Sequence, residues 1–439
     1  MTDKPASGSK RFWKLASMTA GVSGRLAKSK LQQFFQNPDA AQESQKKMLK
    51  ENSEAIAQTL GELKGAVMKV GQMASITSDI LPAPLAEALK RLQNEAPPVS
   101  FKVIEEQIIS ELGDHPDTLF KDFQREPYAA ASIGQVHLAR LHDGRQVVVK
   151  IQYPGVDDAM DSDLKHLKLT LKASGLLKMD AASMDALFEE LKSRLREELD
   201  YKHEAENQKI FYDYYRNDNK VIVPELIAER SSSRILTLIH EPGEQFGDLW
   251  NDGYPQETID ELGSIMLRMI GEQIFILGAV HADPNPANFA CRDDGRVILY
   301  DFGCIKRVSR PVIDAYRDTI KAALRRQYPE VEEGLIRLGV RNVDGPPVEH
   351  AYYEEWRNLL AEPYEYGGPY NFGKTDLHLR AAQKIPYLIT HKLESFKPPV
   401  EIAFIDRAVA GLFGNLRLMG AACDVRAIAE PYLFGNLAP

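Results

Sequence analysis

Residues 281–288 read HADPNPAN, and residues 300–303 read YDFG. The histidine stands two residues before Asp283, and Asn288 follows Asp283 by five positions. Asp301 begins the triplet D-F-G directly after a short apolar run, RVILY, which has the composition of a buried strand. Proline cannot continue a helix, so the two prolines before Asn288 predict a stiff loop that holds its polar side chains in a defined arrangement.

This spacing is typical of enzymes that act on phosphoryl groups. Protein kinases use H-R-D-x-x-x-x-N followed by D-F-G, and both spacings occur here in the same order. Hard cations such as Mg²⁺ prefer oxygen ligands, so we predict that Asn288 and Asp301 hold the metal. Asp283 then occupies the position of a general base or a carboxylate that orients the nucleophile.

An alanine-rich stretch, AAASIGQV, occupies residues 129–136. Aligned with the nucleotide-binding pattern G-x-G-x-x-G-x-V, it replaces the first two glycines by alanine and keeps the third as Gly134. Alanine restricts the backbone and favours helical geometry, so we expect Ala129 to Ser132 to form a turn that meets phosphates differently. Lys150 ends the run VVVK after a predicted hairpin and is expected to contact the nucleotide phosphates.

The order of predicted elements indicates an α+β protein. The first 115 or so residues read as helical, and a small mixed region with a hairpin turn at Asp143-Gly144 follows. Predicted strands cover 135–140, 146–151, 233–239 and 296–300, whereas 157–215 and most of the chain from about 255 onward read as helical. We therefore predict three regions, comprising residues 1–115, 116–240 and 241–439.

A kinase-like site also needs an acidic residue to orient Lys150. Three acids lie close together in the segment REELDYKHE, namely Glu198, Asp200 and Glu204, and the pattern alone does not choose among them.

Composition excludes several classes of protein. The 439 residues are 44% hydrophobic and 27% charged, as in an ordinary globular protein, and the net charge of −9 argues against general nucleic-acid binding. Three cysteines without C-x-x-C spacing favour a reducing compartment over a disulfide framework or a zinc site. No run of 18 apolar residues is present, so we expect no membrane-spanning helix.

The first 30 residues are strongly basic, with seven Lys or Arg against the single acid Asp3. Phe12, Leu15, Val22 and Leu26 share one face of a predicted helix. Three interpretations fit this pattern: an interfacial helix on anionic lipid, an organelle transit sequence, or a solvated basic tail with a helix facing the core.

Four features together resemble the UbiB family of ubiquinone-biosynthesis-type atypical kinases. They are the K-x-G-Q motif at Lys69–Gln72, the alanine loop at 129–132, the E-x-D of Glu198–Asp200, and the 281–288 loop with its D-F-G. The resemblance implies a two-lobed protein-kinase-like fold with an N-terminal helical extension that carries K-x-G-Q. A separate polar stripe of Gly65, Lys69 and Gln72 on the predicted helix 63–75 fits this arrangement.

The resemblance also implies roles for individual residues. It makes Asp283 the catalytic aspartate, Lys150 the phosphate-binding lysine and Glu198 the ion-pair partner of Lys150. It places ATP or ADP against Ala129, Ala130, Ala131 and Ser132, Mg²⁺ on Asn288 and Asp301, and Lys69 and Gln72 at the nucleotide and substrate site. It also implies that the edge of the adenine base is read by backbone groups at the end of the strand 233–239, namely those of Leu238, Ile239, His240 and Glu241.

The function implied is that of a Mg²⁺-dependent ATPase or small-molecule kinase that supports isoprenoid-quinone biosynthesis. It would act on, or extract, a prenylated lipid or quinone precursor at a membrane surface, with quinone-biosynthesis proteins as possible partners and no nucleic acid. The expected location is the bacterial cytoplasm with peripheral membrane association, or the mitochondrial matrix. A protein serine/threonine kinase and a non-enzymatic, nucleotide-gated scaffold remain as alternatives.

Overall fold

A computed structural model describes residues 99–435, with gaps at 131–132, 175–180, 247–248, 250–252, 382, 385–391 and 393. The basic N-terminal segment, Lys69 and Gln72, Ala131 and Ser132 lie outside the described residues. The chain divides into two compact units. The first contains residues up to 205 together with 226–240, and the second contains 206–225 and 241 onward.

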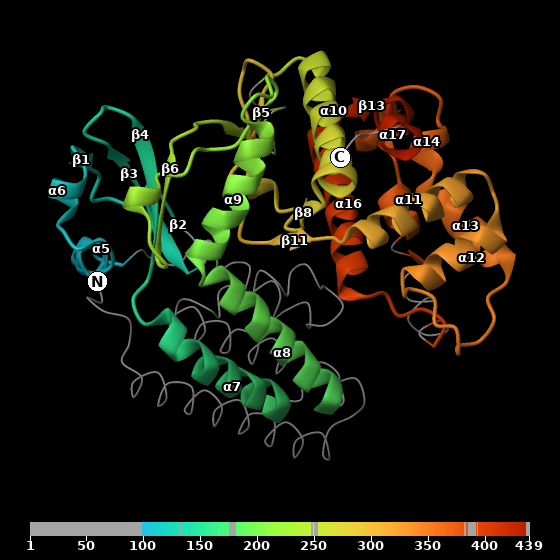
Figure 1. The fold of residues 1–439 in the computed structure, drawn as a ribbon, viewed down its shortest axis with the longest axis horizontal. Helices are drawn as coiled ribbons and strands as arrows, with labels where there is room; N and C mark the ends of the chain where they lie inside the picture. The colour runs from blue at the N-terminus through green and yellow to red at the C-terminus, as the bar shows by residue number, and fades with distance from the viewer. Residues whose placement is uncertain are drawn as a thin grey trace, which may run out of the picture. The chain divides into compact units, whose positions relative to one another are not determined.

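The first unit is built on an antiparallel sheet of five strands (Figure 1). Its central strands are β3 (Gly134–Arg140), β4 (Gln146–Gln152) and β6 (Ile235–Ile239), while β1 (Asp122–Phe123) and β2 (Ala129–Ala130) pair with β3. The turn between β3 and β4 uses Gly144 at φ 95°, as the Asp-Gly pair predicts. The hairpin therefore forms where the sequence places it.

Side-chain alternation along β4 separates the core of this unit from its polar face. Val147, Val149 and Ile151 are fully buried in a cluster with the helix α5 (Phe101–Leu112), near the short helix α6 (Pro116–Leu119). Successive strand residues point to opposite faces, so Lys150 projects from the other side of the sheet. That side carries a second cluster, formed by Tyr201, Leu236 and Leu238.

Three helices follow β4 in the chain. The helices α7 (Val156–Ser174) and α8 (Ala181–Glu198) pack together, and Lys192 and Arg196 of α8 both pair with Asp161 of α7. The third helix, α9 (Tyr201–Tyr215), begins in the first unit and ends in the second. The sequence predicted one helical region here, and within the described residues the structure divides it at Leu199-Asp200, between α8 and α9.

The second unit contains small sheets that position its loops. One has the order β5 (Val221–Ile222), β10 (Val297–Leu299), β9 (Phe289–Cys291), β7 (Glu244–Gln245). Two further sheets have two strands each. In one, β8 (Ala279–His281) pairs with β11 (Ile305–Arg307), and in the other, β12 (Tyr370–Asn371) pairs with β13 (Ala422–Cys423). Only β10 was predicted from sequence, because strands of two or three residues are too short to show alternation.

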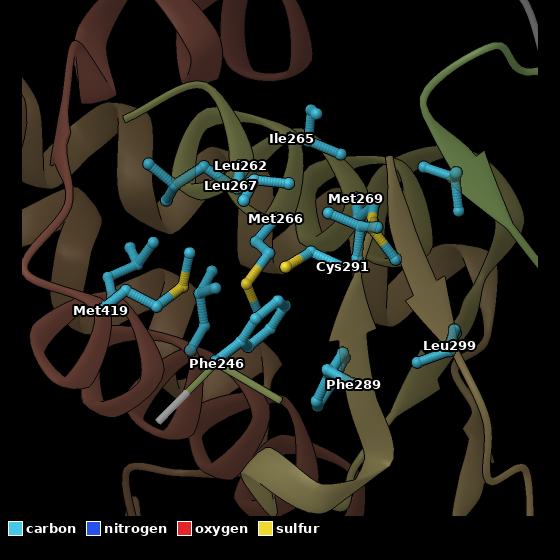
Figure 2. Close-up of a cluster of buried hydrophobic side chains, with 14 of the residues drawn as sticks. Phe246, Leu262, Ile265, Met266, Leu267, Met269, Phe289, Cys291, Leu299 and Met419 are labelled. Carbon is cyan, nitrogen blue, oxygen red and sulfur yellow. The ribbon is translucent and has the colours of Figure 1, made fainter. Parts of the chain in front are cut away.

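Helices make up the rest of this unit (Figure 1). In its core, α10 (Gln256–Glu272) packs against α16 (Val400–Met419), and Figure 2 shows Phe246, Met266 and Cys291 gathered in the same apolar cluster. Other helices of this unit are α11 (Arg310–Leu324), α12 (Tyr328–Arg337), α13 (His350–Leu360), α14 (Glu362–Glu365) and α17 (Val425–Phe434). Within the part of the chain described, every helix is too short or too polar to cross a bilayer.

Candidate active site

The first unit contains a lysine that forms an ion pair with a buried carboxylate. Lys150 Nζ lies 2.8 Å from Glu204 Oε1 and 3.0 Å from Glu204 Oε2, and it sits 4.9 Å from the centre of the Tyr201 ring. Only 3% of the Glu204 side chain is exposed, against 21% of Lys150. The carboxylate therefore fixes the ammonium group where it can still reach solvent or a ligand.

The sequence of α9 explains why Glu204 faces inward. Tyr201, Glu204, Gln208, Phe211 and Tyr215 recur at the spacing of one helical stripe, and all five are buried. A glutamate on a stripe of large aromatic residues must enter the interior with them. There it meets the lysine that the strand directs toward the same side.

The structure gives Asp200 a different task from Glu204. Asp200 Oδ1 accepts the backbone N–H groups of Lys202 and His203, at 3.1 Å and 3.2 Å, and so caps the start of α9. Among the three candidate acids, Glu204 pairs with Lys150, whereas Asp200 caps the helix. The side chain of Glu198 lies outside the described residues, so its assignment stays a prediction. The aromatic stripe is a sequence signal that Glu204 faces the interior, but the stripe does not show that Lys150 lies there.

The alanine loop differs from the expected helical turn. Ala129 and Ala130 form β2, pairing with Val136 and Gln135 of β3, so that expectation is wrong for these two residues. Cross-strand hydrogen bonding overrides the helix preference of alanine, beginning where Tyr128 N–H donates to Val136 O at 2.8 Å.

Gly134, the retained glycine of the pattern, has a packing role. A Cβ built on it would lie 2.1 Å from the carbonyl oxygen of Ile151 on the neighbouring strand β4. The backbone of β4 therefore leaves no room for a side chain at this position.

The four residues expected at the adenine edge are divided by the unit boundary. Leu238 and Ile239 lie in β6, paired with Val148 and Val147, and His240 N–H donates to Gln146 O at 2.9 Å. Glu241 begins the second unit's next segment, where its carbonyl accepts the Tyr300 hydroxyl at 2.7 Å. Their contact with a nucleobase stays a prediction.

In the second unit, two strands bring the 281–288 loop to the D-F-G segment. The strand pair β8–β11 aligns His281 with Ile305, and Ala282 N–H donates to Cys304 O at 2.9 Å. His281 Nε2 lies 2.5 Å from the carbonyl oxygen of Asp301. We call residues 281–288 the catalytic loop. Its first residue, His281, thus contacts Asp301, the predicted metal ligand.

Asn288 and Asp283 are joined directly across the catalytic loop. Asn288 Nδ2 donates to Asp283 Oδ2 at 3.0 Å and to the Asp283 carbonyl at 3.3 Å. The amide nitrogen is thereby turned toward Asp283, which leaves the amide oxygen as the atom to offer a cation. The loop also stiffens itself, because Asn285 Oδ1 accepts the Ala287 N–H at 3.1 Å.

Asp301 and its neighbours are held by buried contacts. Asp301 Oδ1 accepts the Gly303 N–H at 2.9 Å, and the fully buried ring of Phe302 packs 5.4 Å from Phe211. Asn207, in the part of α9 that belongs to this unit, donates to the Phe302 carbonyl at 3.2 Å. The triplet is therefore anchored through its phenylalanine and presents its aspartate beside the loop.

The chemistry of these donors fits a magnesium ion. One carboxylate and one amide oxygen suit a hard cation that completes its shell with water and substrate phosphates. Among the described residues, no three His, Cys, Asp or Glu side chains gather as a metal cluster. The carboxylate of Asp301 and the amide oxygen of Asn288 are donors of the kind that Mg²⁺ prefers.

Comparison with known proteins identifies the family. Residues 91–335 match the family described as "ABC1 atypical kinase-like domain". The chain is 32% identical over 396 residues to "Atypical kinase coq-8, mitochondrial" of Caenorhabditis elegans, covering 88% of this chain and 52% of the worm protein. It is 30% identical over 424 residues to "Atypical kinase COQ8, mitochondrial" of Schizosaccharomyces pombe, covering 95% of this chain and 68% of the yeast protein.

A solved structure extends the likeness to the fold. The Rv3197–erythromycin complex from Mycobacterium tuberculosis has a TM-score of 0.65 and 28% sequence identity, and the match covers 91% of this chain and 100% of that one. This chain spans only about half the length of the worm relative. The α+β, kinase-like fold expected from the motifs is confirmed. The chain belongs to the ABC1 family of atypical kinase-like proteins, in the group that includes the COQ8 and UbiB kinases.

Proposed function

We propose that this protein is a Mg²⁺-dependent ATPase or small-molecule kinase that supports isoprenoid-quinone biosynthesis. The observation that carries the proposal is the ion pair between Lys150 and the buried Glu204. A lysine with a purely structural role in a strand needs no buried acid, whereas a phosphate-binding lysine benefits from being kept charged and pointed in one direction. A lysine–glutamate pair of this kind is required for catalysis in protein kinases.

The geometry of each unit supports the other roles that we propose. Lys150 binds the nucleotide phosphates, and Asn288 and Asp301 hold Mg²⁺, which neutralises phosphate oxygens when bound. Asp283, oriented by its hydrogen bond from Asn288, accepts a proton from the attacking hydroxyl or water, or orients that group. The choice between hydrolysis and transfer depends on which nucleophile reaches Asp283.

The lipid part of the proposal rests on relatives and on sequence. The two relatives described above are named COQ8-type atypical kinases and mitochondrial, and the four motifs resemble ubiquinone-biosynthesis-type kinases. We propose a prenylated lipid or quinone precursor as the ligand, met at a membrane surface by peripheral association. A bacterial cytoplasmic or mitochondrial matrix setting is compatible with this proposal.

ATP turnover by four proteins tests the proposal. Wild type, Asp283→Asn, Glu204→Gln and the matched control Glu206→Gln are assayed with and without anionic liposomes and a quinone-precursor mimic. Glu206 is exposed on the same helix as Glu204. We expect Asp283→Asn to lower turnover by about 10²-fold or more, as for loss of a general base. Glu204→Gln weakens nucleotide binding and turnover because Lys150 loses its charged partner, and Glu206→Gln behaves as wild type.

Three results would contradict this function. Nucleotide binding without turnover under every condition would leave a nucleotide-gated scaffold as the better description. Phosphorylated protein substrates, lost in Asp283→Asn, would favour a protein kinase. If Glu204→Gln and Glu206→Gln changed nucleotide binding and turnover equally, the ion pair between Lys150 and Glu204 would have no special role in the activity.

A further inference from the structure

One face of α16, a helix in the C-terminal part of the chain, contacts the catalytic loop. Arg407, Gly411 and Asn415 are spaced by four residues, so they form a single stripe along the helix. Each member of the stripe meets the segment Asp283-Pro284. Both elements belong to the second unit, and the helix is separated from the loop by more than 100 positions in the sequence.

The three contacts are of different kinds. Asn415 Nδ2 donates to the Pro284 carbonyl at 3.1 Å. Gly411 lies so close to the proline ring that a Cβ built on it would be 1.9 Å from Pro284 Cβ. Arg407 places a guanidinium nitrogen 3.6 Å from Asp283 Oδ1. The loop backbone, the proline and the carboxylate are thus each met by one residue of the stripe.

Arg407 complements the carboxylate of Asp283 in charge and direction. Asp283 is only 9% exposed, and its other oxygen, Oδ2, already accepts from Asn288. The kinase pattern H-R-D has an arginine beside the aspartate, but Ala282 stands there in this chain. Among the described residues, Asp283 forms its ion pair with Arg407, whose own Nε is buried without a hydrogen-bond partner.

We propose that Arg407 is a positioning residue for Asp283 and that the α16 stripe holds the catalytic loop in its working geometry. Asn288 fixes one carboxylate oxygen and Arg407 attracts the other, so the plane of the carboxylate is defined from two sides. The guanidinium also balances a negative charge that is mostly removed from solvent. This inference rests on the proposed role of Asp283 in phosphoryl chemistry.

The test compares Arg407→Met, Arg407→Lys and the control Arg417→Met. Arg417 lies on the same helix but is exposed. We expect Arg407→Met to lower kcat about tenfold to a hundredfold, since small displacements of reacting groups have effects of this size. The Kd of a fluorescent ADP analogue should stay within about twofold, because the contact that is lost is the one to Asp283. Arg407→Lys should recover part of kcat, and Arg417→Met should match wild type.

Hydrogen exchange supplies a readout that does not depend on turnover. Peptides covering residues 282–291 should exchange faster in Arg407→Met, and at the wild-type rate in Arg417→Met. If wild type hydrolyses no ATP but this difference is seen, the proposed function fails and the positioning contact stands. The inference is overturned if Arg407→Met keeps wild-type kcat and loop exchange, or if its nucleotide Kd rises as much as its kcat falls.

Discussion

His137 shows how one polar residue of the first unit depends on protonation. The ring is fully buried in β3 and stacks 5.3 Å from Phe123. Its Nδ1 lies 2.8 Å from the Gln124 carbonyl and its Nε2 lies 2.9 Å from Gln135 Nε2. A neutral ring satisfies both contacts, donating from Nδ1 and accepting at Nε2.

Burial lowers the pKa of His137 below its ordinary value of 6.5, since desolvation outweighs the bond to Gln124 and the charge of Glu126. Below about pH 6.5, His137 is protonated in the unfolded chain but stays neutral in the folded protein. The free energy of unfolding therefore decreases as the pH is lowered, until the pH reaches the lowered pKa of the folded state. The slope from this one group is at most about 1.4 kcal/mol per pH unit.

Urea unfolding at pH 7.5 and 5.5 checks this prediction. We expect wild type to lose stability at the lower pH, and His137→Gln to lose less of it because the titrating ring is gone. His378→Gln, a substitution at an exposed histidine of the second unit, should keep the wild-type pH dependence. A pH dependence that is the same in His137→Gln and wild type would contradict the assignment.

Most of the contacts at the site that sequence patterns did not predict join residues far apart in the chain. Lys150, Asp283, Asn288 and Asp301 were recognised because each belongs to a motif whose members lie close together in the chain. The pairing of Lys150 with Glu204 joins positions 54 residues apart, and it depends on how α9 meets β4. Local sequence patterns identify candidate partners for Lys150, whereas the packing of the elements determines which of them contacts the lysine.

The catalytic loop is supported by a π-helical turn that no sequence motif predicts. The helix α10 passes into a π-helical turn, Gln273–Leu277, before β8 begins. In that turn Gln273 Oε1 accepts the backbone N–H of His281 at 3.0 Å. Such turns are rare and occur often at functional sites, and here the turn supplies a side-chain partner to the first residue of the loop.

The two glycines of α16 give a matched pair of substitutions. Gly411→Ala would drive a methyl group into Pro284, so we expect a loss of stability and at least about a tenfold loss of turnover. A Cβ added at Gly414 would meet nothing within 4 Å, so Gly414→Ala should raise the free energy of unfolding by about 0.5–1 kcal/mol. Thermal unfolding and ATP turnover of both variants provide the measurement.

The outcome separates close packing from helix propensity. If both substitutions stabilise the protein and leave turnover intact, then Gly411 does not constrain the loop. A loss confined to Gly411→Ala would show that the proline ring needs the space. Alanine at both positions improves the intrinsic helix preference of α16 equally, so the difference between the variants reports the contact.

Charge distribution over the whole chain bears on membrane association. The net charge of −9 opposes binding to anionic lipid, whereas the first 30 residues carry seven basic groups and one acid. If this segment forms the predicted interfacial helix, attraction is local to it and is screened by salt. The segment lies outside the described residues, so the prediction comes from sequence alone.

Deletion of residues 1–30 should weaken flotation with anionic liposomes and leave nucleotide affinity unchanged. We expect the wild-type interaction to decline as ionic strength rises, because it depends on exposed charges. Neutral phosphatidylcholine vesicles serve as the control and should bind both proteins weakly. Unchanged flotation of the deletion variant would contradict a membrane role for this segment.

The fold class, the hairpin with its Asp-Gly turn, and the candidate site residues followed from the order of amino acids along the chain. These features depend on backbone stereochemistry, side-chain alternation and motif spacing, which act over a few residues. The extended form of Ala129-Ala130, the choice of Glu204, the space reserved at Gly134 and Gly411, and the approach of Arg407 to Asp283 required the assembled protein. Each depends on the distance between segments remote in sequence, which packing of the whole chain sets.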